Sequence, residues 1–294
     1  MSNYDTELKD FPSTVSLKGK LVVITGGSRG LGLHAASGIL QAGAQKVFKT
    51  SRKALACAQA VSLLNNLPNL APGAKAIAVP ADISTIARIQ GLVKQVGELT
   101  EYVDVLVANA GASWGERFED HSDGAFGKVM DLNVRGVFGC LRLFAPLLQK
   151  RGTIADPSRV IITASVAGLA IGTLGPHATY AYSASKAAAI HLSKNLAVEL
   201  GPRHILVNAI APGLFPTKMA NGLIDLCGGL EETAKRNPSG RNGVPEDIAG
   251  LVVFLSSRAG SHANGAVVTV DGGEYLISGS LGGMFGAGKG ESKI

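Results

Sequence analysis

The sequence predicts a single α/β domain, in which helices cover both faces of a doubly wound, parallel sheet of about seven strands. Two observations support this prediction. Short runs rich in aliphatic and β-branched residues alternate with longer segments whose apolar residues recur at helical spacing, which is typical of repeated strand–helix–strand units. The 294-residue chain is also 46% hydrophobic and only 17% charged, so it has the apolar side chains for one large core.

The individual elements follow from this alternation in chain order. The predicted strands cover residues 21–25, 46–50, 76–79, 103–108, 160–163, 205–209 and 266–270. The predicted helices cover residues 31–41, 54–65, 85–99, 125–149, 181–200 and 245–255. Because crossovers between parallel strands are right-handed, ligands of such a sheet bind at the carboxyl ends of its strands.

Some segments do not follow the alternation. We predict an N-terminal extension over residues 1–16, the α/β domain over residues 17–273, and a Gly-rich C-terminal tail over residues 274–294. Within the domain, residues 212–241 combine Gly, Pro and mixed charges, and this composition indicates a lid over a substrate site.

The charges of the chain are unevenly distributed. The net charge is +6, yet residues 11–81 contain eight basic residues and no Asp or Glu. Such a segment indicates an anionic ligand, and a phosphorylated small molecule accounts for it without nucleic acid. The three cysteines, Cys57, Cys140 and Cys227, are far apart and without C-x-x-C spacing, so neither a disulfide framework nor a metal site is expected.

A glycine-rich turn follows the first predicted strand. It reads Thr25-Gly26-Gly27-Ser28-Arg29-Gly30-Leu31-Gly32 and continues directly into a predicted helix. Gly26 and Gly30 would let the backbone approach a pyrophosphate, and Gly32 would let the helix pack against the strand. The helix N-terminus adds N–H donors and a positive dipole. A dinucleotide cofactor is therefore expected here.

The end of the second strand indicates which dinucleotide binds. An NAD site has an acidic residue at this place to hold the adenosine ribose, but here the sequence reads Lys49-Thr50-Ser51-Arg52-Lys53. Ser51 and Arg52, with Arg29 from the glycine turn, could bind a 2′-phosphate through charge-assisted hydrogen bonds. These residues predict NADP(H) in preference to NAD(H), unless the cations only form a solvated face.

A tyrosine and a lysine four residues apart form the candidate catalytic pair. Tyr182 and Lys186 fall on one face of a predicted helix, whereas Tyr180 has Ala184 at the same spacing. A free phenol, with a pKa of about 10, exchanges protons poorly at neutral pH. A neighbouring ammonium and a cationic nicotinamide would favour the phenolate and lower that pKa.

Taken together, these motifs resemble those of the short-chain dehydrogenase/reductase family. The glycine spacing, the Asn109-Ala110-Gly111 segment, the Tyr182/Lys186 pair and the Pro212-Gly213 segment appear in family order over about residues 17–273. The resemblance implies a Rossmann-type fold and a catalytic set made of Asn133, Ser165, Tyr182 and Lys186. The interval from Ser165 to Tyr182 is longer than is usual in the family.

The resemblance also assigns the cofactor site. Asp82 would contact the adenine or cap the following helix, Asn109 would bond backbone at the turn, and Thr217 would hold the nicotinamide carboxamide. The full set of expected cofactor-binding residues is Gly26, Ser28, Arg29, Gly30, Leu31, Gly32, Ser51, Arg52, Asp82, Ile83, Asn109, Ala110, Gly111, Tyr182, Lys186, Pro212, Gly213 and Thr217.

The expected substrate is a carbonyl compound, reduced to a secondary alcohol. Trp114, Phe118, Phe215 and Met219 could line an apolar pocket or could be ordinary loop packing. The loops resemble the 3-oxoacyl-[acyl-carrier-protein] reductase branch, including reductases named for rhamnolipid biosynthesis, which implies a 3-oxoacyl thioester. Basic residues that could meet an acyl carrier protein, or simply be solvated, are Lys150, Arg151 and Arg203.

Two other functions stay open at this point. A general NADPH-dependent ketone reductase for hydrophobic ketones would need no basic docking patch. A non-catalytic NADP(H) sensor would use the fold only for binding. We expect a cytoplasmic protein without a membrane partner, although Ser292-Lys293-Ile294 nearly matches a peroxisomal address. The resemblance implies a homotetramer or homodimer formed through helices 125–149 and 181–200.

Overall fold

The computed structural model describes residues 10–277 of the chain. It contains one seven-stranded sheet of order β3-β2-β1-β4-β5-β6-β7, and every neighbouring pair is parallel. The strands are β1 (Leu21–Thr25), β2 (Lys46–Thr50), β3 (Lys75–Ala78), β4 (Val105–Ala108), β5 (Ser158–Thr163), β6 (Ile205–Pro212) and β7 (Val267–Val270). The predicted doubly wound sheet is confirmed.

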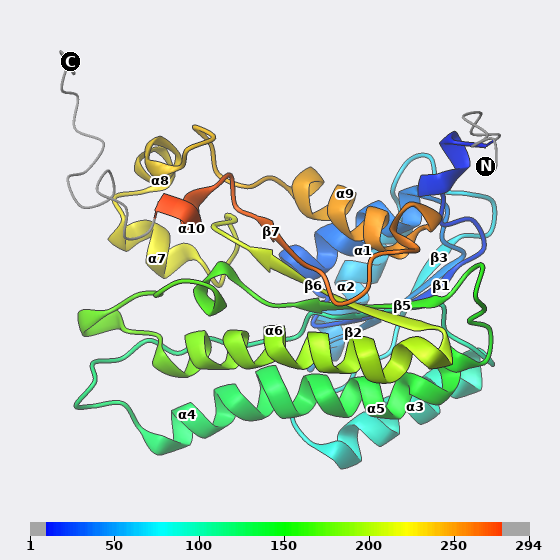
Figure 1. The fold of residues 1–294 in the computed structure, drawn as a ribbon, viewed down its shortest axis with the longest axis horizontal. Coiled ribbons are helices and arrows are strands. Elements are labelled where there is room, and N and C mark those ends of the chain that lie inside the picture. Colours follow the sequence, from blue (N-terminus) through cyan, green and yellow to red (C-terminus); the bar gives the residue numbers. More distant parts are fainter. Residues whose placement is uncertain (1–9, 278–294) are drawn as a thin grey trace, which may run out of the picture.

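Helices cover both faces of this sheet (Figure 1). They are α1 (Leu31–Gln41), α2 (Ala54–Asn65), α3 (Ile86–Leu99), α4 (Asp123–Met130), α5 (Val137–Gln149), α6 (Tyr180–Leu200), α7 (Asn221–Leu226), α8 (Leu230–Arg236), α9 (Pro245–Ser256) and α10 (Glu274–Ile277). Each strand alternates its side chains between the two faces, so Val23 packs toward α3, α5 and α6, and Ile24 toward α1 and α9. The two apolar clusters hold the sheet between the helical layers.

The predicted helix over residues 125–149 is interrupted in a specific way. A six-residue π-helix, η2 (Asp131–Gly136), joins α4 to α5 without a break in the helical rod. A Cβ on Gly136 would come 2.7 Å from the Ile83 carbonyl oxygen, so the rod passes close to the loop after β3. The extra residue in a π-turn changes which side chains of the helix face that loop. Asn133 lies within the π-helix.

Other differences from the predicted elements occur at their ends. β6 continues to Pro212 because its parallel pairing extends to Thr163 of β5 and Val270 of β7. The proposed lid over residues 212–241 contains the short helices α7 and α8. Residues 10–16 and 274–277 belong to the expected extension and tail, and the rest of both lies outside the described residues. Between residues 10 and 277, no helix has both the length and the apolar character needed to cross a membrane.

Candidate active site

The glycine turn lies between β1 and α1 in a conformation that only glycine adopts readily. Gly26 and Gly30 have φ of +65° and +56°, and a Cβ on Gly26 would come 2.5 Å from the Cα of Ala110. The N-cap of α1 is Gly30, so no side chain caps the first turn of the helix. Leu33 and His34 donate their N–H groups to the Gly30 carbonyl oxygen, and the N–H groups of Leu31 and Gly32 are left for an anionic ligand.

Asn109, at the end of β4, holds the turn in place. Its Nδ2 donates to the carbonyl oxygens of Thr25 and Gly26 at 3.1 and 3.0 Å, and its Oδ1 accepts from the Thr163 hydroxyl at 3.3 Å. Gly32 must lack a side chain, because its Cβ would lie 2.5 Å from that same Nδ2. The carboxyl ends of β1, β4 and β5 are thus connected through one amide.

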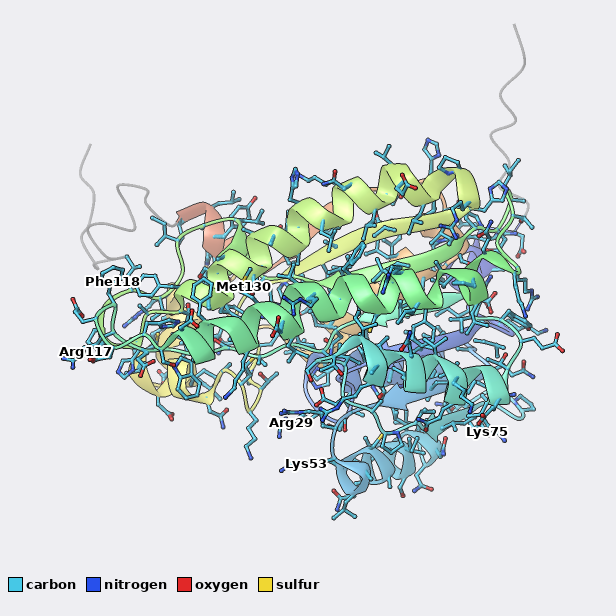
Figure 2. The ribbon with its side chains drawn as sticks, turned by 90° about the horizontal axis from the view of Figure 1, so that it is seen from below. Arg29, Lys53, Lys75, Arg117, Phe118 and Met130 are labelled. Atoms are coloured by element: carbon cyan, nitrogen blue, oxygen red, sulfur yellow. The ribbon has the colours of Figure 1, made fainter. Side chains whose placement is uncertain are left out.

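Two cations, Arg29 and Arg52, lie at this edge of the sheet. Arg29 in the turn and Arg52 after β2 are exposed, and within residues 10–277 neither forms an ion pair. Figure 2 shows Arg29 and the neighbouring Lys53 on the same side of the molecule. Arg29 and Arg52 together can bind a phosphate group.

Asp82, after β3, serves the local backbone. Its carboxylate accepts from the Ser84 N–H at 2.9 Å and pairs with Arg88. Burial raises the Asp82 pKa, but the Ser84 hydrogen bonds and the charges of Arg88 and Arg52 outweigh it and lower the pKa below its usual value. The effect of Arg52 puts Asp82 within electrostatic reach of the candidate phosphate site, and the next residue, Ile83, is buried.

The candidate catalytic side chains come together at the ends of β4 and β5. Lys186 is buried, donates to the Thr163 carbonyl oxygen at 2.7 Å, and has its Nζ 5.5 Å from the centre of the Tyr182 ring. The Ser165 hydroxyl forms a side-chain hydrogen bond with Tyr182 and lies 3.5 Å from the Pro212 carbonyl oxygen. α6 therefore presents the phenol and the ammonium beside Ser165, which follows β5.

Asn133 reaches this group from the π-helix. Its Oδ1 accepts from the Ala112 N–H and its Nδ2 donates to the Ala112 carbonyl oxygen, both at 2.9 Å. Nδ2 also donates to the Ser185 hydroxyl at 2.9 Å. A Cβ on Gly111 would lie 3.2 Å from Asn133 Oδ1 and 3.5 Å from Lys186 Nζ. The loop after β4 is thus fixed against both residues.

Burial governs the titration of the catalytic pair. Burial lowers the pKa of Lys186 to about 8. It raises the pKa of Tyr182, and the Ser165 hydrogen bond opposes that rise only in part. The lowered tyrosine pKa expected from the sequence is therefore not a property of Tyr182 and Lys186 alone. The additional positive charge of a nicotinamide beside Tyr182 would lower its pKa.

The segment after β6 closes over the glycine turn. Gly213 donates its N–H to the Val270 carbonyl oxygen at 3.2 Å. A Cβ on Gly30 would lie 3.3 Å from the methyl carbon of Thr217, so Thr217 contacts the turn. Of the remaining expected cofactor residues, Ser28, Leu31, Ser51, Ala110 and Pro212 all lie at this same edge of the sheet.

The four expected substrate residues do not share one environment. Trp114, Phe118 and Met219 are 49%, 74% and 58% exposed. The Phe118 ring meets the Tyr180 ring edge to face, at the opposite end of the molecule from Lys75 (Figure 2). Phe215 differs, because it is 4% exposed and belongs to the core beneath α9. Its ring fills the space beside Gly243 and does not line an open pocket.

The basic residues considered for carrier-protein docking lie elsewhere. Arg151 stacks on the Tyr102 ring, with its guanidinium 4.8 Å from the ring centre, and Arg203 bonds to the Gln149 side chain. Both, with Lys150, follow the ends of α5 and α6, beside the first residues of β5 and β6. They lie at the opposite edge of the sheet from Tyr182 and do not flank the catalytic group.

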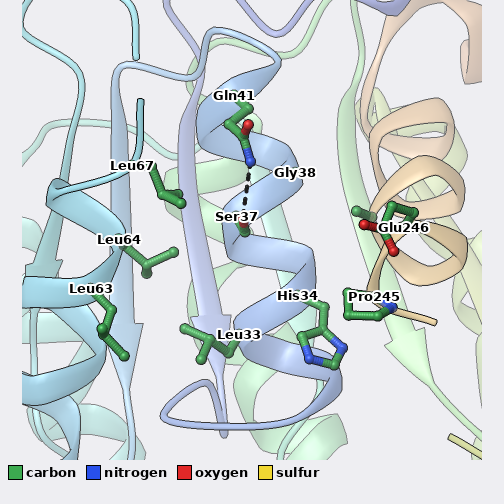
Figure 3. Close-up of a pocket in the computed structure, with 11 residues that line it drawn as sticks. Leu33, His34, Ser37, Gly38, Gln41, Leu63, Leu64, Leu67, Pro245 and Glu246 are labelled. Carbon is green, nitrogen blue, oxygen red and sulfur yellow. Dashed lines mark hydrogen bonds between the residues drawn. The ribbon is translucent and has the colours of Figure 1, made fainter. Parts of the chain in front are cut away.

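A separate hollow of about 290 Å³ lies between α1, α2 and α9 (Figure 3). Leu33, Leu63 and Leu67 form its apolar walls, and His34 and Glu246 lie at its rim. None of the candidate catalytic residues lines it. Within residues 10–277, no group of three or more His, Cys, Asp or Glu side chains is arranged to hold a metal ion.

Sequence reasoning missed three residues that build the site. Thr25 accepts two backbone N–H bonds through its hydroxyl, Thr163 holds Lys186, and Ser185 links Asn133 to the Tyr182 carbonyl oxygen. Each lies next to a motif residue or ends a strand, and this position could have identified it from the sequence. The sequence gives no such signal for the burial of Lys49, because a lysine among several basic residues is expected to be solvated.

Comparison with known proteins identifies the relatives of this chain. The family described as enoyl-(acyl carrier protein) reductase matches residues 26–274. The rhamnolipids biosynthesis 3-oxoacyl-[acyl-carrier-protein] reductase of Pseudomonas aeruginosa is 42% identical over 261 residues, covering 89% of this chain and 98% of that protein. The short-chain dehydrogenase/reductase PhomF of Diaporthe leptostromiformis is 32% identical over 286 residues, with 90% and 94% coverage.

Solved structures of similar fold and sequence indicate the same family. The active-site complex of Pseudomonas aeruginosa RhlG with NADP superposes with a TM-score of 0.82 at 41% identity, covering 90% of this chain and 99% of that one. A short-chain type dehydrogenase/reductase from Mycobacterium marinum gives a TM-score of 0.81 at 32% identity, with 90% and 98% coverage. With its parallel sheet, glycine turn and Tyr182/Lys186 pair, this chain belongs to the short-chain dehydrogenase/reductase family of oxidoreductases.

Proposed function

We propose that this chain reduces a carbonyl group to a secondary alcohol with NADPH. The observation that carries the proposal is the convergence of Tyr182, Lys186, Ser165 and Asn133 at the ends of β4 and β5, beside the glycine turn. When bound, the cofactor supplies the hydride. The protein supplies the binding site, the orientation of the carbonyl and the proton.

The residues of the turn fit NADP(H). Gly26, Gly30 and the uncapped start of α1 leave space and N–H donors for a pyrophosphate. Arg29 and Arg52 carry unpaired positive charge where a 2′-phosphate would lie, and Thr217 contacts the turn from the segment after β6. The similarity to the active-site complex of Pseudomonas aeruginosa RhlG with NADP supports the same choice.

Tyr182 and Ser165 would act on the substrate oxygen. The Ser165 hydroxyl donates a hydrogen bond that orients the carbonyl, and the Tyr182 hydroxyl donates the proton that neutralises the developing alkoxide. Lys186, with a pKa of about 8, stabilises the phenolate that remains. Asn133 fixes the Gly111–Ala112 loop and the backbone of α6 around this proton path.

The proposed substrate is a 3-oxoacyl thioester or a related β-keto compound. Exposed apolar side chains near the catalytic group and the similarity to a 3-oxoacyl-[acyl-carrier-protein] reductase support it. The position of Lys150, Arg151 and Arg203 at the far edge of the sheet favours the second candidate, a general reductase of hydrophobic ketones that needs no carrier protein.

NADPH oxidation tests the proposal directly. The panel contains an acetoacetyl thioester, a β-keto ester, an aryl ketone and a quinone, with NADH in parallel. Thioester turnover with NADPH is the expected result, and turnover of free ketones alone would select the second candidate. Tyr182→Phe should reduce kcat by 100-fold or more, on the order expected for loss of a general acid, while NADPH still binds. Near-normal turnover by this variant would contradict the proposed mechanism.

The cell location and assembly of the chain belong to the same proposal. Cytoplasmic placement stands as an expectation, and the peroxisome-like Ser292-Lys293-Ile294 lies outside the described residues. A homotetramer or homodimer is supported by apolar side chains on the outward faces of two long helices: Phe138 of α5 is 41% exposed and Val198 of α6 is 80% exposed. Sedimentation equilibrium of the purified chain measures the state.

A further inference from the structure

Lys49 is a buried lysine beneath the glycine turn. Its side chain, on β2, is fully buried, and its Nζ donates to the Gly32 carbonyl oxygen at 2.7 Å. A Cβ on Gly27 would lie only 1.9 Å from this Nζ, so the amino group touches the underside of the turn. Within residues 10–277, no carboxylate lies within 4.0 Å of it.

This position is electrostatically unfavourable for an ammonium. The amino group lies at the first turn of α1, where the helix dipole is positive, and one carbonyl bond offsets only part of the cost of removing a charge from water. Burial accordingly lowers the pKa of Lys49 to about 7. A lysine used only for packing would gain nothing here that an aliphatic side chain lacks.

The other charged and titratable groups around Lys49 compensate it only in part. From α2, the Cys57 thiol donates to the Lys49 carbonyl oxygen at 3.0 Å. Its charge interaction with Lys49 raises the Lys49 pKa by less than burial lowers it, and burial raises the pKa of Cys57 itself, which favours the neutral thiol. Arg29 in the turn and Arg52 beyond the end of the strand are cations. On α1, His34 instead lies near Glu246 of α9. The missing partner is an anion, and the open side of the turn is where one would bind.

We propose that Lys49 is a positioning residue that couples dinucleotide binding to the uptake of a proton. The anionic phosphates over the glycine turn stabilise the Lys49 ammonium from the other side of Gly27, and the ammonium strengthens their binding. A proton passes from the solvent to Nζ when the dinucleotide binds, and no covalent bond changes. The proposal rests on the proposed binding of NADP(H).

Thermodynamic linkage fixes the sign of the effect. Because the bound form favours the ammonium, affinity for NADP⁺ is highest when Lys49 is already protonated and falls as pH rises above 7. If binding raises the Lys49 pKa by one unit, affinity falls about tenfold across that range. A phosphate monoester with a second pKa of about 6 is already ionised at pH 8, so the ligand itself takes up little proton there.

Isothermal titration calorimetry with NADP⁺ at pH 8 measures the proton directly. The titration is run in two buffers of different ionisation enthalpy. The wild type should take up a fraction of a proton more per cofactor bound than a variant without the Lys49 amine, because proton changes at Tyr182 and Lys186 are common to both. Lys49→Met, and Lys49→Gln as a second neutral variant, should lose this uptake and the fall in affinity between pH 7 and 9. Circular dichroism confirms that each variant is folded.

Lys46→Met is the matched control. Lys46 lies at the other end of the same strand, is half-buried, and has its Nζ 3.5 Å from the Leu99 carbonyl oxygen. The Lys46→Met substitution therefore removes an equal charge at a site away from the turn. Its proton uptake should equal that of the wild type. Equal uptake by wild type and both Lys49 variants would overturn the coupling while NADP⁺ binding stands. Failure of the folded wild type to bind NADP⁺ would overturn the proposed function as well.

Discussion

Lys49 and Lys186 show how differently a lysine can behave once it is buried. Each donates to one carbonyl oxygen at 2.7 Å, and burial lowers the two pKa values to about 7 and about 8. Lys186 stands beside a phenol that exchanges a proton, whereas Lys49 stands beneath a backbone that binds an anion. The spacing to Tyr182 predicts the first of these roles. Nothing in the strand pattern around Lys49 distinguishes it from its exposed neighbours.

The buried Lys49 ammonium should make the free protein less stable at low pH. Its folded-state pKa lies below its unfolded-state value, so the folded state binds fewer protons between pH 7 and about 10, and stability rises with pH over that range. Below pH 7 Lys49 is protonated in both states, and burial of its ammonium destabilises the folded state to the full extent. Lys49→Met should therefore be more stable than the wild type by on the order of a few kcal/mol at pH 6.5.

Urea unfolding at pH 6.5, 8 and 9.5 measures this difference. The advantage of Lys49→Met should shrink as pH rises, and Lys46→Met should show no such trend. A constant difference between Lys49→Met and the wild type at all three pH values would mean that the wild-type amino group does not titrate over this range.

Arg52 should determine the preference for NADPH over NADH. A charge-assisted hydrogen bond to a phosphate contributes roughly 1.5–3 kcal/mol, so Arg52→Ala should raise the KM for NADPH by about 10- to 100-fold and leave NADH nearly unaffected. Lys53→Ala, the exposed neighbour, is the control. Equal losses with both cofactors would show that Arg52 does not read the 2′-phosphate. Steady-state kinetics with each cofactor decides this.

At the scale of elements, the start of α1 depends on the close contact between Gly32 and Asn109. Gly32→Ala would push a Cβ to 2.5 Å from Asn109 Nδ2 and 2.9 Å from the Gly26 carbonyl oxygen. We expect a loss of about 1–3 kcal/mol in unfolding free energy together with weaker NADPH binding. Thermal melts and cofactor titrations measure both quantities.

Gly91, within α3, provides the matched control for Gly32. A Cβ there meets nothing within 4 Å, so Gly91→Ala should stabilise the protein by about 0.5–1 kcal/mol through helix propensity alone. The two substitutions are chemically identical and should have opposite signs. Stabilisation by Gly32→Ala would contradict the packing described for the turn.

The elements that the sequence predicts well are the long ones with clear periodicity. The helices over residues 31–41 and 54–65 and the strands over residues 21–25 and 46–50 are confirmed to the residue. α7 and α8 were missed because helices of six and seven residues are too short to show a readable period. The π-helix was missed because the apolar pattern continues through it, although its extra residue in the turn sets where Asn133 points.

Some residues of the candidate site could be predicted from the sequence and others could not. Motif spacing alone selects Tyr182, Lys186 and the glycine turn, because their chemistry requires fixed separations. Contacts between distant segments are not encoded locally, so the roles of Thr163 and Ser185 became visible only in three dimensions. The sequence left Phe215 open between an apolar pocket and loop packing for the same reason, since an apolar residue in a loop gives no indication of whether it faces core or solvent.

At the scale of the whole molecule, three neighbouring strands send apolar loops toward the catalytic group. Because β4, β5 and β6 are adjacent, the segments that follow them surround the same edge of the sheet. Their exposed large apolar residues are Trp114, Phe118, Leu169, Ile171, Leu174, Met219, Leu223 and Leu226. These side chains offer an apolar surface to a substrate with a hydrocarbon chain.

Turnover should therefore increase with chain length. Each buried methylene contributes about 0.8 kcal/mol, so kcat/KM for a series of 3-oxoacyl esters or ketones should rise up to about fourfold per carbon until added carbons no longer contact the protein. Ile171→Ser, at a residue 79% exposed beside the site, should flatten this dependence. Ile154→Ser, at a residue 87% exposed near the start of β5, should not. A series without chain-length dependence in the wild type would contradict an apolar binding surface.

The strand order also determines how the protein must be made. β1 pairs with β2 on one side and with β4 on the other, yet β4 leaves the ribosome about 80 residues after β1, which takes several seconds at 5–20 residues per second. During that interval β1, β2 and β3 can associate while one edge of β1 has no partner. An apolar strand edge open for this long invites pairing with other nascent chains. Newly synthesised molecules are therefore most vulnerable to aggregation at this stage, before the second half of the sheet arrives, and chaperone binding should be strongest then.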